Sequence, residues 1–286
     1  MLIVIGFLVV LASVFGGYVM LGGYLGALYQ PLELLIIGGA ALGSFFAANT
    51  FKSLKATFRV LPQLFRSSKY DKAIYLDVMA LLYTLLLKAR REGMMALESH
   101  VEDPAASPIF SSYPKLLADK GLMTFLTDYL RLMVSGNMSA HEIETLMDEE
   151  IETFRHEVEV PATALRTVAD AMPAFGIVAA VLGVVKALAA IDKPPAVLGE
   201  LISAAMVGTF LGIFLAYGFV GPLASRTDRL NAEMVKMLEC IKITLLANLN
   251  GYPPPLAVEF GRKVLYSTER PTFAELDEHV RSSKNK

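Results

Sequence analysis

The sequence predicts an all-α, polytopic membrane protein with four transmembrane helices and a helical cytoplasmic domain, into which long third and fourth helices extend. Two observations support this prediction. The 286 residues are 54% hydrophobic and have a mean hydropathy of +0.49, which is high for a soluble domain of this size. The apolar residues are also unevenly spread, since the first 32 residues contain no charged side chain. No segment of any length shows the alternating pattern of a strand.

Four apolar segments are long enough to cross the hydrocarbon core of a membrane, which takes about 20 helical residues. They are residues 1–22, 32–51, 172–191 and 200–221. The first segment has no basic start and is longer than the apolar part of a leader peptide, so we expect a retained helix. Because short turns join the first segment to the second and the third to the fourth, we expect two packed hairpins.

The distribution of lysine and arginine predicts that both large polar segments and both termini lie in the cytoplasm. Of the 26 basic residues, 14 lie between residues 52 and 166, and ten lie between residues 226 and 286. Lys186 and Lys193 are the others. The expected parts are transmembrane helices one and two (1–52), a cytoplasmic helical domain (53–171), transmembrane helices three and four (172–222), and a cytoplasmic C-terminal helix and tail (223–286).

The polar segments are expected to be helical. Apolar residues at helical spacing predict helices over residues 70–90 and 121–135, the second of which stops at Gly136. Ser139 and Glu142 have the spacing of a capping box, which predicts the start of a long acidic helix.

Three prolines are expected to interrupt helices. Pro161 should bend or end the acidic helix, Pro173 should open the third span, and Pro222 should close the fourth before another helix runs to about residue 250. Pro173 and Pro222 are equidistant from a point between residues 197 and 198, so we expect them at one depth. Each leaves the carbonyl four residues earlier, on Ala169 or Gly218, without its helical partner. They indicate either ordinary helix ends or a wet entrance or hinge.

Small residues recur along one side of the third and fourth spans, where they allow helix backbones to approach closely. They are Gly176, Ala180, Gly183 and Ala187 in the third span, and Ala204, Gly208, Gly212 and Ala216 in the fourth. This pattern predicts a tight assembly of several helices.

A proton path across a bilayer usually needs an ionisable group near the midplane. The first, third and fourth spans have no carboxylate in their cores, and Glu33 is expected at the outer end of the second. Thr209 and Ser203 offer only hydroxyl groups. If the protein moves ions, we therefore expect a partner helix to bring the carboxylate.

Residues 87–100, LKARREGMMALESH, gather five charged side chains around one glycine. They are Lys88, Arg90, Arg91, Glu92 and Glu98. Charge alone favours a solvated helix end, and a contact surface for another protein is the alternative.

Several function classes are excluded or disfavoured. The net charge of −2 does not suggest nucleic-acid binding, and the single cysteine, Cys240, allows no intramolecular disulfide. The four histidines are too scattered to suggest a metal site, and we find no phosphate-binding loop, nucleophile elbow or H-E-x-x-H motif. No enzyme is therefore predicted.

The chain closely resembles the MotA family of flagellar motor stator proteins over nearly its whole length. The matching stretches are VIGFLVVLASVFGGY, YPKLLAD, LMDEEIETF, PAFGIVAAVLGVV, AMVGTFLGIFLAYGF and LANLNGYPPPLAVEFGRKVLYSTERP. The resemblance implies a torque generator of the bacterial inner membrane that is driven by protons and has no cofactor. It also implies a ring of five copies around two copies of MotB, whose transmembrane aspartate would be the missing carboxylate.

The resemblance assigns roles to six residues. Pro173, Pro222, Thr209 and Ala180 match the ion-pathway and coupling residues of the family, and Arg90 and Glu98 match its contacts with the rotor protein FliG. It implies no role for Arg91 or Lys186. Three alternatives are open: an energiser of outer-membrane processes resembling ExbB or TolQ, which have three spans; a sodium-driven stator subunit; and a purely structural membrane scaffold.

Overall fold

The computed structural model describes residues 2–66 and 68–283, and within these ranges the regular elements are all helices. The chain forms two compact units. The membrane unit comprises Met1–Ser67 and Val158–Arg229, and the polar unit comprises Ser68–Glu157 and Leu230–Lys286. Two helices, α9 (Ala140–Leu188) and α11 (Gly221–Leu249), contribute to both units. These units follow contacts within the protein, so their limits differ from those of the parts expected from hydropathy.

The membrane unit contains the apolar helices that the sequence predicts. Its complete elements are α1 (Leu2–Met20), η1 (Leu25–Leu28), α2 (Pro31–Ala48), α3 (Phe51–Val60), η2 (Leu61–Phe65), α10 (Pro195–Leu215) and the π-helix η4 (Ala216–Val220). In the described part of the chain, four helices are long and apolar enough to cross a membrane. The predicted number of spans is therefore confirmed.

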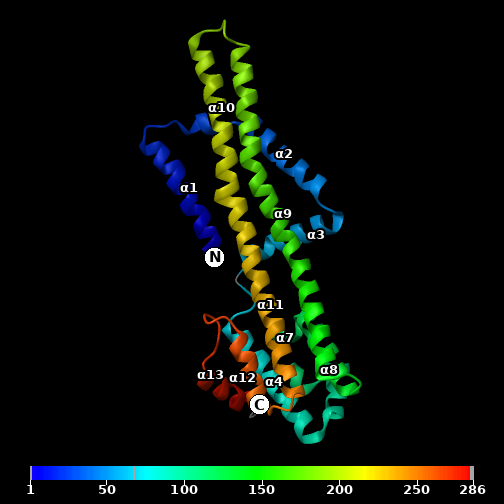
Figure 1. Cartoon of the computed structure of the whole chain (residues 1–286). Coiled ribbons are helices and arrows are strands. Elements are labelled where there is room, and N and C mark those ends of the chain that lie inside the picture. Colours follow the sequence, from blue (N-terminus) through cyan, green and yellow to red (C-terminus); the bar gives the residue numbers. More distant parts are fainter. Residues whose placement is uncertain (1, 67, 284–286) are drawn as a thin grey trace. The chain divides into compact units, whose positions relative to one another are not determined.

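The second half of α9 and α10 pack as a hairpin whose backbones nearly touch (Figure 1). A Cβ atom added at Gly212 would lie 2.7 Å from the Met172 carbonyl oxygen and 2.9 Å from the Gly176 Cα. A Cβ atom added at Gly183 would lie 2.6 Å from the Ala205 Cβ. All three distances are too short for non-bonded heavy atoms, so Gly176, Gly183 and Gly212 line the helix contact as predicted. Ala205, which the predicted series did not include, lies at the contact too.

The first two spans do not form a packed hairpin of their own, so this expectation was wrong. Helix α1 packs along the end of α10 and the π-helix, where the ring centroids of Phe15 and Phe214 lie 5.3 Å apart and those of Phe7 and Phe219 lie 4.9 Å apart. Helix α2 packs on a different part of α10 through Ile37, which is fully buried. The segment that contains η1 separates the two helices and lets each bind α10 separately.

The prolines do not begin or end helices in the expected way. Helix α9 runs without interruption through Pro161 and Pro173, and Pro222 is the second residue of α11. A proline in a helix interior removes one hydrogen bond at a cost of about 3 kcal/mol, but α9 remains helical through both prolines because its other turns keep their hydrogen bonds. Before Pro222 the chain forms the π-helix, in which the Gly221 N–H donates to the Ala216 carbonyl oxygen.

Pro173 and Pro222 also lie at different depths, contrary to expectation. The contacts of Gly176 with Gly212 set the register of the hairpin, so Pro173 is level with Leu215. Pro222 lies farther along by about 10 Å, since each helical residue adds about 1.5 Å. The expectation failed because the turn between α9 and α10 is centred near residue 194, ahead of the midpoint of the two prolines.

The polar unit is built around α4 (Lys72–Glu92), which is buried along most of its length. Its other complete elements are η3 (Met94–Leu97), α5 (Glu98–Glu102), α6 (Pro108–Ser111), α7 (Pro114–Leu117), α8 (Lys120–Ser135), α12 (Pro254–Val264) and α13 (Phe273–Ser283). Helices α4 and α8 confirm the two helices predicted in this region. Burial and a hydrogen bond to Asp119 raise the pKa of the Tyr70 hydroxyl, which therefore stays a donor at physiological pH.

The predicted end of α8 and the predicted start of α9 are both confirmed. Gly136 ends α8 with a φ of +64°, a left-handed conformation that glycine adopts without strain. At the start of α9 the Ser139 N–H donates to a Glu142 carboxylate oxygen at 2.7 Å, and the Glu142 N–H donates to the Ser139 hydroxyl at 3.3 Å. This reciprocal pair is the predicted capping box.

We expect Gly212→Ala to destabilise the protein by about 1–3 kcal/mol, because the added methyl group forces the two backbones apart. Gly199→Ala is the matched control, since it lies in the same helix and its Cβ would have no neighbour within 4 Å. The control should be neutral or gain up to about 1 kcal/mol from helix propensity. Thermal unfolding of the purified protein in detergent measures both, and equal transition temperatures would contradict the close-contact interpretation.

Candidate functional site

The charged cluster of the polar unit leaves three side chains unpaired. Lys88 and Glu92 form an ion pair with a nitrogen-to-oxygen distance of 2.7 Å. Arg90 and Arg91 at the end of α4, and Glu98 at the start of α5, are exposed and make no ion pair with any residue that the structure describes. The cluster therefore has two positive charges and one negative charge without an ion-pair partner among the described residues.

The segment that carries these unpaired charges is held in place by buried neighbours and by backbone geometry. Gly93 follows α4 with a φ of +90°, which lets the chain turn sharply into η3. Leu97 and Val101 are buried on either side of Glu98 and anchor this segment in the core. Arg131 strengthens the anchor, because it donates to the Val101 carbonyl oxygen at 3.0 Å.

A helix end explains only part of this arrangement. The C-terminus of α4 attracts cations, so Arg90 and Arg91 would be favourable there in any protein. Glu98 lies in the first turn of α5, where a helix N-terminus favours an acidic side chain, so helix ends account for the signs of these charges but not for their lack of ion-pair partners. Met95, between them in sequence, is 63% exposed and offers an apolar contact that the sequence analysis did not single out.

Two of the four predicted pathway residues, Ala180 and Thr209, lie at the contact between α9 and α10. A Cβ atom added at Gly208 would lie 3.5 Å from the Ala180 backbone nitrogen, and one added at Gly176 would lie 3.4 Å from the Thr209 carbonyl oxygen, so the backbones of both residues lie at the contact. Both are partly exposed. Pro173 lies two helical turns away in α9 and Pro222 is more distant, so the structure brings Ala180 and Thr209 together but does not bring the prolines to them.

Glu33 lies deeper along the hairpin than the sequence suggested. It is in the first turn of α2, as expected, but its Cγ atom would lie 3.6 Å from a Cβ atom added at Gly208. The carboxylate is thus level with Ala180 and Thr209, and no residue in the described ranges pairs with it. The sequence could not show this, because α2 begins beside the middle of α10 and hydropathy does not give that register.

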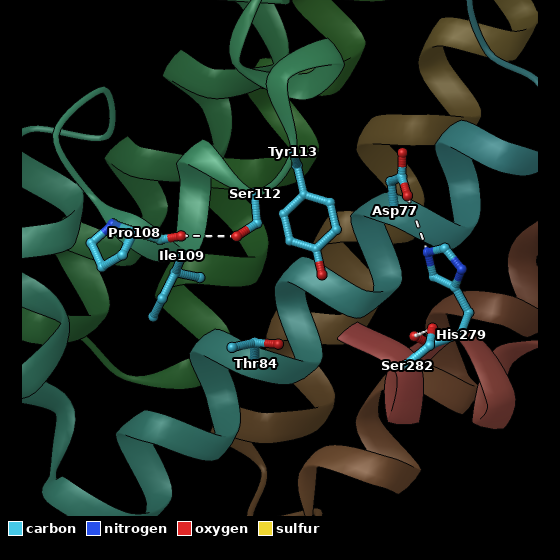
Figure 2. A pocket seen from close by; sticks show the side chains of 8 residues that line it. All are labelled: Asp77, Thr84, Pro108, Ile109, Ser112, Tyr113, His279 and Ser282. Carbon is cyan, nitrogen blue, oxygen red and sulfur yellow. Dashed lines mark hydrogen bonds and ion pairs between the residues drawn. The ribbon is translucent and has the colours of Figure 1, made fainter. Parts of the chain in front are cut away.

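The polar unit also holds a cavity of 340 Å³ between α4, α6 and α13. Figure 2 shows Asp77 and His279 facing each other there, with a distance of 3.0 Å between the Asp77 Oδ1 and the His279 Nε2. The Ser112 hydroxyl is also occupied, because it donates to the Pro108 carbonyl oxygen. Within the described ranges no three histidine, cysteine or acidic side chains form a group that could hold a metal ion. The Asp77–His279 contact ties α13 to α4.

Cys240 is inaccessible in the folded polar unit. It is fully buried in α11, and burial raises the pKa of its thiol to about 12. A thiol of this kind is a poor nucleophile.

Comparisons with known proteins fit this geometry. Residues 4–93 match the family model described as motility protein A N-terminal, and residues 117–240 match the MotA/TolQ/ExbB proton channel family. The chain is 61% identical to motility protein A of Salmonella typhimurium over 100% of this chain and 97% of the relative, and 41% identical to chemotaxis protein LafT of Vibrio parahaemolyticus over 96% of each.

Two solved structures share the fold. The flagellar MotAB stator complex from Bacillus subtilis matches with a TM-score of 0.76 and 27% identity, and covers 93% of this chain and 97% of the solved chain. The C. jejuni MotAB structure matches with a TM-score of 0.78 and 22% identity, and covers 94% and 98%. With this agreement over its full length, the chain belongs to the MotA/TolQ/ExbB proton channel family, on the motility protein A branch.

Proposed function

We propose that this chain is a stator subunit of the bacterial flagellar motor, which couples inward proton flow to torque on the rotor. The observation that carries the proposal is the combination, in one chain, of a glycine-packed apolar hairpin with an outward-facing set of unpaired charges. The full-length similarity to motility protein A supports it. Such a subunit is a multi-pass protein of the inner membrane, with both termini in the cytoplasm.

The partner of the membrane unit is a copy of MotB, whose transmembrane aspartate carries the proton past Ala180 and Thr209. The hairpin supports such an assembly, because much of its apolar surface is uncovered in the single chain. Large apolar side chains are exposed along its outer half: Val181 (56%), Val185 (58%), Leu188 (63%) and Met206 (71%). Neighbouring copies and the partner helix would cover this surface, in a ring of five copies around two copies of MotB.

The coupling step moves the α9–α10 hairpin when the partner aspartate changes its charge. A potential of 100 mV supplies about 2.3 kcal/mol for each proton that crosses, which is well above thermal energy. Pro173 and Pro222 lie about 10 Å apart along the hairpin, and the π-helix lies between their levels. The helix segment between the two levels, which includes the irregular turn, is the part that bends.

The polar unit passes the motion to the rotor. Arg90 and Glu98 are its working charges, and they face groups of opposite charge on FliG. Their exposure and lack of partners among the described residues support this role. The same observation argues against an ExbB- or TolQ-like energiser, as do the four apolar helices and the match to the N-terminal motility protein A model.

Charge reversal at this surface should impair swimming far more than neutralisation. An exposed ion pair contributes about 0.2–1 kcal/mol, so Arg90→Ala or Glu98→Ala should reduce swimming only in part. Arg90→Glu or Glu98→Lys adds repulsion and should nearly abolish it, and a compensating reversal on the rotor should restore some motility. Lys115→Glu, a reversal at another exposed site in the polar unit, is the control. Normal swimming of both reversed variants would place the contact elsewhere.

Replacement of either coupling proline should separate assembly from torque. Pro173→Ala or Pro222→Ala restores an amide donor and straightens the helix, so both variants should reach normal membrane levels and bind MotB. Their torque, measured with beads on tethered filaments, should fall severely. Pro161→Ala, in the same helix as Pro173, should keep wild-type torque. Poor accumulation or weak MotB binding of the first two variants would make these prolines purely structural.

Proton drive predicts three results. Swimming should stop with a protonophore at constant sodium concentration and continue when potassium replaces sodium. The chain expressed without MotB, or with a MotB whose transmembrane aspartate is alanine, should not acidify the cytoplasm. Sodium-dependent swimming would instead support a sodium-driven subunit, and proton flux through the purified chain alone would contradict the need for a partner carboxylate.

A further inference from the structure

A cavity of 670 Å³ opens in the membrane unit beside Pro222, at the start of α1. Its lining has two chemically different parts. Leu2, Ile3 and Tyr217 form an apolar wall, and Tyr217 is 66% exposed. Arg166 and two arginines of α11 form a basic wall. A binding site with both parts suits an amphipathic ligand.

The basic wall carries excess positive charge. Arg226 donates from Nε to the Leu64 carbonyl oxygen at 2.6 Å and from Nη2 to the Arg66 carbonyl oxygen at 2.8 Å, so its charge is fixed in place without a carboxylate partner. Arg229 is exposed and has no ion-pair partner among the described residues.

Two carboxylates oppose this charge in part. Arg166 forms an ion pair with Asp228, which leaves its other donors free. Asp170 is the one acidic side chain in the lining and makes no ion pair in the described part of the chain. The three guanidinium groups are thus opposed by two carboxylates, Asp170 in the lining and Asp228 beside it, which leaves one positive charge in excess.

The position of the cavity favours the headgroup of a membrane lipid over a soluble anion as the ligand. It lies where the uncharged helix α1 begins, and α1 is long and apolar enough to span a membrane. That level corresponds to the boundary between headgroups and hydrocarbon. Planar guanidinium groups bind phosphate oxygens well, and basic pockets between transmembrane helices are typical sites for anionic headgroups.

We propose that this cavity binds the phosphate headgroup of an anionic phospholipid such as phosphatidylglycerol, with an acyl chain against Leu2, Ile3 and Tyr217. A free phosphate ion would meet the same arginines but would leave the apolar wall empty. Because Pro222 is part of the lining, the headgroup touches the segment at which α11 leaves the π-helix. If the proposed bending of the hairpin is correct, the lipid therefore binds directly to the segment that bends, in addition to the lipids that surround the protein.

The test uses the full chain together with its MotB partner, reconstituted in phosphatidylcholine vesicles with spin-labelled phosphatidylglycerol or spin-labelled phosphatidylcholine. Electron paramagnetic resonance gives the fraction of each labelled lipid that is immobilised by the protein. The wild type should select phosphatidylglycerol. Arg229→Gln should lower the selectivity about fivefold, which is the effect of one arginine near an anionic headgroup. Asp170→Asn should raise it, and this opposite change does not depend on the stability of the arginine variant.

The controls distinguish binding in the cavity from a general attraction of anionic lipids by positive charges on the protein surface. Arg59→Gln removes an exposed positive charge of the same unit outside the cavity, so it should leave the selectivity unchanged. An equal loss in Arg59→Gln and Arg229→Gln, or no change in Arg229→Gln and Asp170→Asn, would overturn the proposal. Displacement of the labelled lipid by inorganic phosphate would also overturn it, in favour of a soluble anion. None of these readouts depends on torque or ion flux, so the stator proposal is tested separately.

Discussion

The close approach of α9 and α10 is the constraint on which the rest of the membrane unit depends. Gly212 and Gly176 allow the two backbones to come within a distance that excludes a methyl group. In a bilayer, helices gain nothing from hiding apolar surface from water, so dispersion contacts at this distance have to hold the pair. The register that these contacts fix decides the level of Ala180, Thr209 and Pro173.

The other membrane helices are positioned by their contacts with this hairpin. Helix α1 binds it through aromatic pairs near the π-helix, and α2 binds it through a fully buried Ile37. This arrangement leaves the half of the hairpin nearer the turn between α9 and α10 uncovered in the single chain, as the exposed Val185 and Leu188 show. That surface can contact lipid, and in the assembly proposed for the protein it can also contact neighbouring copies and the partner helix.

Sequence reasoning succeeded where the signals are local. The number of spans follows from runs of apolar residues, and the end of α8 follows from Gly136. The start of α9 follows from the capping box formed by Ser139 and Glu142. It failed where the answer depends on register. The relative depth of Pro173 and Pro222 depends on the position of one turn and on one irregular helical segment. Neither feature produces a periodic pattern of apolar residues in the sequence. The same limit hid the level of Glu33, while the roles of the site residues came from family resemblance alone.

The π-helix gives this hairpin a degree of freedom that an uninterrupted α-helix lacks. Its turn, closed by the hydrogen bond from Gly221 to Ala216, holds one residue more than an α-helical turn. One residue corresponds to about 100° of rotation around a helix axis. If that turn tightened to α-helical geometry, α11 would therefore rotate against α10 by about that angle while the chain stayed helical on both sides. The residues whose geometry sets this rotation end one position before Gly221 and two before Pro222.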